Sequence, residues 1–174
     1  LSCIDWQPVF IDFFSGATHS PEYHTKPNSM GEAPVLIDGY LTFTQSGVIQ
    51  DYVSEKTGKF SGHTAAERRK ILPWILWDNQ KLSTNAGALR FMMNFLPQAK
   101  RSAEIIRYLG GRLKAAYTVL YAHPEGQDWI VGETITKADL TCCRYLYYPS
   151  PFRFKHATRP NNNLSPNNIS SKDS

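Results

Sequence analysis

The sequence lacks the features that mark a membrane protein or a secreted one. No run of apolar residues approaches the roughly eighteen that a membrane-spanning helix requires. No basic segment followed by an apolar one forms a signal peptide at the start of the chain. We therefore expect a cytoplasmic protein with no membrane partner.

Cysteine and histidine are also scarce, and neither is spaced for metal or redox chemistry. The three cysteines are Cys3, Cys142 and Cys143, an odd number without a C-x-x-C spacing. The adjacent pair lies in a predicted helix, where a bridge between neighbours would strain the backbone. His19 and His24 have no partners at metal-ligand spacing. We expect small buried thiols, solvated histidines and no metal site.

Charge gives little support for a nucleic-acid partner. The chain of 174 residues carries a formal net charge of +4, with 41% hydrophobic and 13% aromatic residues, enough for a buried core in one ordinary domain or two small ones. The basic residues are scattered, are offset by acidic ones or lie near the end of the chain. We expect no nucleic-acid binding.

A β-hairpin followed directly by a helix is the strongest local pattern. The run Val35 to Ile37 is apolar and largely β-branched, Asp38-Gly39 is typical of a hairpin turn, and Leu41 and Phe43 continue with period two. Gln45-Ser46 then precedes apolar residues at helical spacing: Val48, Ile49, Tyr52 and Val53. The N–H groups of a first helical turn, with a serine hydroxyl, can receive a carboxylate. The alternative is that Ser46 simply caps the helix.

This region resembles the amino-terminal domain of cytosolic, bacterial-type glutathione S-transferases. The matching positions are Gly31, Pro34, Asp38-Gly39 and Gln45-Ser46. The resemblance implies glutathione as co-substrate. It also implies a cis Pro34 that shapes the site, an Ala33 backbone that pairs with the cysteinyl backbone of glutathione, and Gln45 and Ser46 side chains that hold its γ-glutamyl end.

The first residues are expected to form a strand over Trp6 to Phe14, with Val9, Ile11 and Phe13 on one face. In the resembled family this would be the second strand, so the family's first strand and first helix have no counterpart here. The family's thiol-activating residue lies between those two elements, so the catalytic residue is unknown. We expect an incomplete amino-terminal domain, because the facing strand edges would lack their partner. One helical turn at most, starting at Ser20-Pro21-Glu22, is expected before the hairpin.

Helical periodicity follows from Thr64 onward. Thr64 and Glu67 form a capping box before a helix that Pro73 should kink or interrupt. Two further helices are expected over Asn85 to Leu96 and Gln98 to Tyr121. The apolar stripes of these helices, including Phe91, Met92, Met93 and Phe95, indicate either core packing or a site for a hydrophobic co-substrate.

A second capping box marks the last predicted helix. Thr136 is its N-cap and Asp139 its N3 residue, a structural pair that resembles the central helix of the transferase helical domain. From about residue 155 the sequence is rich in Pro, Asn and Ser and indicates disorder or a divergent end. The predicted organisation is a glutathione-binding domain over 1–58, a linker over 59–63, a helical domain over 64–154 and a tail over 155–174.

The sequence therefore predicts an α+β protein with a partial thioredoxin-like domain followed by an all-α helical bundle. The resemblance implies a glutathione transferase that uses the glutathione thiolate against small electrophiles, and a homodimer. A glutathione-dependent isomerase or dehalogenase on the same scaffold is not separable from it by sequence. The alternative is a non-catalytic module or an incomplete piece of an enzyme that keeps only the glutathione cradle.

Overall fold

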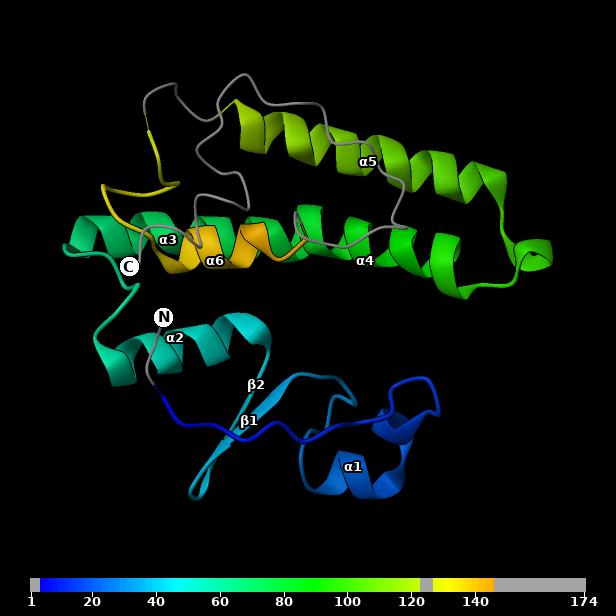
Figure 1. Ribbon diagram of the computed structural model, residues 1–174, viewed down its shortest axis with the longest axis horizontal. Coiled ribbons are helices and arrows are strands. Elements are labelled where there is room, and N and C mark those ends of the chain that lie inside the picture. The colour runs from blue at the N-terminus through cyan, green and yellow to red at the C-terminus, as the bar shows by residue number, and fades with distance from the viewer. Residues whose placement is uncertain (1–3, 123–126, 146–174) are drawn as a thin grey trace. The chain divides into compact units, whose positions relative to one another are not determined.

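The computed structural model describes residues 4–122 and 127–145 and divides after Ser61 (Figure 1). Unit 1 runs up to Ser61 and unit 2 begins at Gly62, a division that falls within the range 59–63. Cys3 and the tail over 155–174 lie outside the described residues. The two units are described separately below.

A two-stranded hairpin and one helix form the main part of unit 1. Strands β1 (Val35–Asp38) and β2 (Leu41–Thr44) are antiparallel, with Val35 opposite Thr44 and Asp38 opposite Leu41. The turn residues are Gly39 and Tyr40, one place later than the expected Asp38-Gly39 pair, and Gly39 has φ 61°. Helix α2 (Ser46–Thr57) follows and packs against both strands. The predicted hairpin and helix are confirmed.

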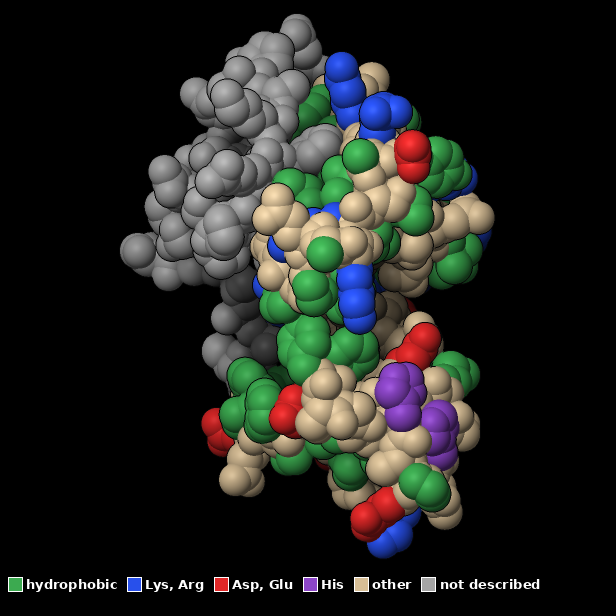
Figure 2. Space-filling view, turned by 90° about the vertical axis from the view of Figure 1, so that its right-hand side faces the viewer, with side chains coloured by type: hydrophobic (Ala, Val, Ile, Leu, Met, Phe, Trp, Pro, Cys, Tyr) green, Lys and Arg blue, Asp and Glu red, His purple; other side chains and the backbone are tan. Residues whose placement is uncertain are grey.

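The predicted strand over Trp6 to Phe14 is wrong. Residues 4–12 have no regular structure and pass into a turn, and Trp6 and Phe10 are 75% and 87% exposed. A strand is stabilised by the backbone hydrogen bonds of a neighbour, and the sheet of the described residues contains only β1 and β2. Hydrophobic side chains consequently remain at the surface, as they do elsewhere on the face drawn in Figure 2.

Two short helical elements precede the hairpin. They are η1 (Ala17–His19), a 3-10 turn, and α1 (Pro21–Thr25). The Ser20 hydroxyl accepts the N–H of Tyr23 at 3.2 Å, and Pro21 occupies the first helical position. The helical turn expected at Ser20-Pro21-Glu22 is confirmed, but the expectation of at most one helical turn before the hairpin is wrong, because η1 adds a second one.

The regular elements in the described part of unit 2 are all helices, joined by loops such as residues 127–136 (Figure 1). Its elements are α3 (Ala65–Trp77), η2 (Asp78–Ser83), α4 (Thr84–Arg90), η3 (Phe91–Phe95), η4 (Gln98–Lys100), α5 (Ala103–Tyr121) and α6 (Lys137–Cys143). Helix α3 packs against α6, and α4 packs against α5. The shared core consists of buried apolar side chains: Ile71, Ile75, Leu82, Ala86, Leu89, Leu113, Ala116, Tyr117, Leu120, Ile130, Val131, Ala138 and Cys142.

Pro73 does not interrupt its helix, which continues to Trp77. Ile71 and Ile75, on either side of the proline, are buried in the core. Helices in proteins are stabilised mainly by packing of their apolar face, so this burial outweighs the hydrogen bond that proline cannot donate. The change to π-helical geometry comes later, at η2.

Helix α5 begins five residues later than predicted. Gln98–Lys100 form the separate 3-10 turn η4, and α5 starts after Ser102, whose hydroxyl accepts the N–H of Ile105 at 3.3 Å. Gly110-Gly111 lie inside the helix, which runs on to Tyr121. Burial of Leu113 and Leu120 stabilises this helix despite the two glycines.

Candidate functional site

The loop after α1 fixes the backbone that leads into β1. The carbonyl oxygen of Glu32 accepts the hydroxyl of Tyr23 at 3.0 Å and the amide of Asn28 at 2.8 Å. Both donor side chains are buried. Two buried donors on a single carbonyl hold the chain in place one residue before Ala33.

The Ala33–Pro34 peptide bond is cis, as the resemblance implied. Both residues are exposed and come directly before β1, whose first residue Val35 pairs with Thr44 at the end of β2. The residues before Val35 and after Thr44 therefore lie at the same end of the hairpin. This register brings Ala33 and Pro34 close to Gln45 and Ser46.

Ser46 is the first residue of α2, and the capping position belongs to Gln45. The alternative in which Ser46 caps the helix is therefore wrong. Gln45 makes no side-chain cap, and the described residues give the Ser46 hydroxyl no hydrogen-bond partner. Gln45 has φ 67°, unusual for a residue other than glycine, and such conformations cluster at binding sites.

The amide of Gln45 is bound to Glu32, a contact that the sequence did not indicate. Gln45 Nε2 lies 2.6 Å from Glu32 Oε2 and 3.5 Å from Met30 Sδ. Glu32 and Gln45 are thirteen residues apart and both are exposed. No local spacing pattern predicts this pair, because the hairpin between them brings them together.

A second polar cluster ties the hairpin to α2. Asp38 Oδ2 accepts the Tyr52 hydroxyl at 2.6 Å and is paired with the Lys56 ammonium. The rings of Phe43 and Tyr52 stack with centroids 4.1 Å apart. Hydrogen bonds from Lys56 and then Tyr52 lower the pKa of Asp38. This cluster fixes α2, and therefore its first turn, relative to the strands.

In unit 2, Asp139 anchors the first turn of α6. Its carboxylate accepts the N–H of Thr136 at 2.8 Å, the hydroxyl of Thr136 at 3.0 Å and the N–H of Ile130 at 2.7 Å. Asp139 and Thr136 are both buried. These contacts are those of a structural residue that no ligand needs to complete.

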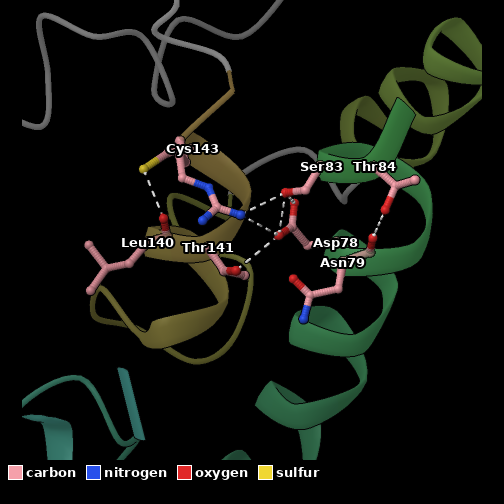
Figure 3. Close-up of polar contacts among 8 residues, drawn as sticks. Asp78, Asn79, Ser83, Thr84, Leu140, Thr141 and Cys143 are labelled. Atoms are coloured by element: carbon pink, nitrogen blue, oxygen red, sulfur yellow. Dashed lines mark hydrogen bonds and ion pairs between the residues drawn. The ribbon is translucent and has the colours of Figure 1, made fainter. Parts of the chain in front are cut away.

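A buried carboxylate that the sequence did not single out joins η2 to α6 (Figure 3). Asp78 accepts the Ser83 hydroxyl at 2.8 Å and the Thr141 hydroxyl at 3.0 Å, and Arg144 lies 3.8 Å from it. Burial raises the pKa of Asp78, although these partners oppose the shift. All the partners belong to the chain itself, so the cluster serves the packing of α6.

The aromatic stripe of η3, which follows α4, is not core. Phe91 and Phe95 are 44% and 43% exposed, and their rings stack at 6.5 Å. Arg90 lies over the Phe95 ring at 5.0 Å, while Met93 packs against the core. The core interpretation is therefore wrong for the two phenylalanines and right for Met93.

Neither cysteine in the described part of unit 2 has the environment of a reactive thiol. Cys142 is buried and Cys143 is partly buried, and neither is in a disulfide. Burial raises the pKa of both thiols, that of Cys143 to about 11. In the described ranges, no three His, Cys, Asp or Glu side chains form a group that could hold a metal ion. Across those same ranges, no helix is long and apolar enough to cross a membrane.

Comparison with known proteins gives a family model and several relatives. The family model described as "Glutathione S-transferase, N-terminal domain" matches residues 3–55. The chain is 29% identical over 147 residues to the disulfide-bond oxidoreductase YfcG of Escherichia coli, covering 80% of this chain and 66% of that protein. It is 29% identical over 144 residues to glutathione S-transferase GST-4.5 of Xanthomonas campestris, covering 79% of this chain and 68% of that protein.

Solved structures share the fold. Glutathione transferase BgramDRAFT_1843 from Burkholderia graminis, solved with two glutathione molecules bound per subunit, superposes with a TM-score of 0.74 at 23% identity. The match covers 82% of this chain and 62% of that one. The predicted fold class, a partial thioredoxin-like domain with a helical domain, is confirmed. The chain spans about two thirds of the length of the relatives it matches.

Proposed function

Because the chain belongs to the glutathione S-transferase family, we propose that it binds glutathione at the end of the hairpin formed by β1 and β2. The proposed contacts come from Ala33, Gln45 and Ser46, with Pro34 shaping the site. All four residues belong to unit 1. The proposed site therefore lies within the described residues of unit 1, 4–61.

The observation that supports this site best is the open first turn of α2. The first N–H groups of a helix have no acceptor inside the helix, and here no side chain of Gln45 caps them. The helix dipole places partial positive charge at the same end. A carboxylate of the γ-glutamyl group would accept hydrogen bonds from these N–H groups and from the Ser46 hydroxyl.

The cysteinyl part of glutathione would lie along the extended backbone at Ala33. That backbone is exposed, and the Glu32 carbonyl before it is held by Tyr23 and Asn28. The hairpin register keeps it beside Gln45. A rigid backbone on one side and a helix terminus on the other suit a short extended peptide with an acidic end.

The reaction we propose is transfer of the glutathione thiolate to a small electrophile. The thiol releases its proton to solvent, its sulfur forms a bond to an electrophilic carbon, and the leaving group departs with the electron pair of the broken bond. The described residues of unit 1 would supply binding and orientation. The catalytic group that stabilises the thiolate remains unassigned, and a binding module without turnover is the alternative.

The two cysteines of α6 do not take part in this proposal. Cys142 is 1% exposed, and burial raises the pKa of both thiols, so neither is a ready nucleophile at neutral pH. A disulfide-bond oxidoreductase activity, as in the name of the Escherichia coli relative, would therefore not use these two thiols. A cytoplasmic location and a homodimer belong to the same proposal.

Calorimetric titration with glutathione tests the site. We expect the substitution Ser46→Ala to weaken glutathione binding by roughly tenfold to a hundredfold, because a hydrogen bond to a charged group contributes about 1.5–3 kcal/mol. The matched control is Thr42→Val, which removes a hydroxyl from an exposed residue of β2 and should leave the affinity unchanged. Equal affinities for the wild type and the Ser46→Ala variant would contradict the site.

Turnover separates the enzyme from the binding module. The full chain is mixed with glutathione and chlorodinitrobenzene, and release of chloride is followed with time. Conjugation above the uncatalysed rate, lost in the Ser46→Ala variant, supports the transferase. Glutathione binding without any rate above background supports the non-catalytic module.

A further inference from the structure

The side chain of Glu32 stands next to the proposed glutathione site and is directed at it. Its carboxylate lies 2.6 Å from the Nε2 atom of Gln45. Glu32 is exposed, so its carboxylate keeps lone pairs that the Gln45 contact does not use. A ligand bound at the first turn of α2 would therefore meet this carboxylate.

The hydrogen bond between Glu32 and Gln45 determines which end of the Gln45 amide is available to a ligand. An ionised carboxylate only accepts hydrogen bonds, so the amide must turn its NH₂ group toward Glu32. Gln45 Oε1 is then left as an acceptor. Glu32 and Gln45 together present oxygen acceptors, whereas the first turn of α2 and the Ser46 hydroxyl present donors.

The position of Glu32 is fixed by its own backbone. Its carbonyl oxygen accepts hydrogen bonds from two buried side chains, those of Tyr23 and Asn28. The residue before it, Gly31, has φ 68° and packs so closely that a β-carbon there would lie 2.6 Å from the His24 ring. A side-chain substitution at Glu32 leaves all of these backbone contacts in place.

The net charge of unit 1 as a whole is also negative, which favours binding of a cation to this unit. Residues 4–61 contain seven acidic side chains and only three basic ones, although the whole chain has a net charge of +4. Two of the basic side chains are paired, Lys26 with Glu22 and Lys56 with Asp38. A single ligand that carries both a carboxylate and an ammonium on neighbouring atoms suits acceptors and donors placed side by side.

We propose that Glu32 determines the specificity of this site for a free α-amino-acid head, here the γ-glutamyl end of glutathione. Its carboxylate receives the α-ammonium and orients the Gln45 amide, while the first turn of α2 takes the α-carboxylate. This inference rests on the proposed glutathione site. It adds to that site a requirement for the positive charge of the ligand.

The test compares two ligands by calorimetry on the full chain: glutathione and N-acetylglutathione, in which acetylation removes the α-ammonium. We expect the wild type to prefer glutathione. The Glu32→Gln variant should bind glutathione roughly five- to tenfold more weakly and N-acetylglutathione as the wild type does, so that the preference disappears. Glu32→Ala should weaken glutathione binding further, because Gln45 also loses its partner.

The matched control is Glu22→Gln, which removes the same charge from an exposed residue of α1 without touching Gln45. It should leave both affinities unchanged. Equal weakening of both ligands by Glu32→Gln, or a preference that survives it, would overturn the role of Glu32. If Ser46→Ala weakens both ligands in that case, the proposed site still stands. If the wild type binds neither ligand, the site and this inference fail together.

Discussion

Gly31 is the residue at which the loop before β1 is most tightly packed. A β-carbon at this position would lie 2.6 Å from His24 Cε1 and 3.1 Å from the carbonyl oxygen of Thr18. The histidine ring can move, but the carbonyl belongs to the backbone. Because Gly31 also has φ 68°, both space and backbone conformation favour glycine.

We expect Gly31→Ala to destabilise the hairpin region by roughly 2–4 kcal/mol, combining the positive φ with the steric conflict. Gly39→Ala is the matched control, since Gly39 has φ 61° but open space around it. It should cost only about 1–2 kcal/mol. Hydrogen exchange at the amides of β1 and β2 measures both free energies, and equal losses would show that the close approach at Gly31 has no cost.

At the scale of elements, two capping boxes begin α3 and α6 in different surroundings. Glu67 accepts the N–H groups of His63 at 2.6 Å and Thr64 at 3.1 Å near the surface. Backbone hydrogen bonds from Thr64 and His63 lower its pKa. Asp139 makes the equivalent contacts while buried, and also accepts the N–H of Ile130 from the preceding loop.

We therefore expect Asp139→Ala to reduce the free energy of unfolding of unit 2 by roughly 2–4 kcal/mol, since two buried N–H donors lose their acceptor. Glu67→Ala should cause a smaller loss, because water can replace the carboxylate there. Urea unfolding of the two variants, compared at neutral pH, gives the difference. A loss for Glu67→Ala equal to that for Asp139→Ala would show that burial adds nothing to the second box.

At the scale of the whole molecule, stability should depend on pH through buried carboxyl groups. Burial raises the pKa of both Asp78 and Asp139. A carboxyl group with a raised pKa binds its proton more tightly in the folded chain, so its contribution to stability is complete below the unfolded pKa of about 3.9. That contribution is lost as the pH rises through the folded pKa.

We accordingly expect the free energy of unfolding to increase as the pH falls from neutral toward the unfolded carboxyl pKa of about 3.9. The pKa values of Asp38 and Glu67 are lowered in the folded chain. Their contributions to the free energy of unfolding are therefore lost as the pH falls, and only below about pH 4. Urea unfolding at several pH values measures the slope, and Asp78→Asn should reduce it by removing one of the two groups. A stability that decreases steadily over the same interval would contradict this assignment.

The exposed apolar side chains of unit 1 show where local pattern fails. The pattern of residues 6–14 predicts a strand, but the segment is irregular. Its apolar side chains are exposed, among them Trp6, Val9, Phe10 and Phe13. Alternation predicts which residues suit a strand, yet a strand also needs a neighbour from elsewhere in the chain. The sequence around residues 6–14 has the alternation that suits a strand, but it does not specify a neighbouring strand.

The sequence by itself determined the features that depend on neighbours a few residues apart. These are the hairpin of β1 and β2, the start of α1 at Ser20, and the carboxylate contacts that begin α3 and α6. Their hydrogen bonds close within a turn or across a tight hairpin. The residue types at fixed offsets are therefore sufficient to predict them.

Only the tertiary structure decided the contacts between distant residues. Glu32 meets Gln45 across thirteen residues, and Asp78 meets Thr141 across 63. The tertiary structure also showed that Ser46 is the first residue of α2 and not its N-cap, and that α3 continues through Pro73. Such contacts depend on how whole elements pack, because burial and close approach stabilise pairs that no local spacing specifies.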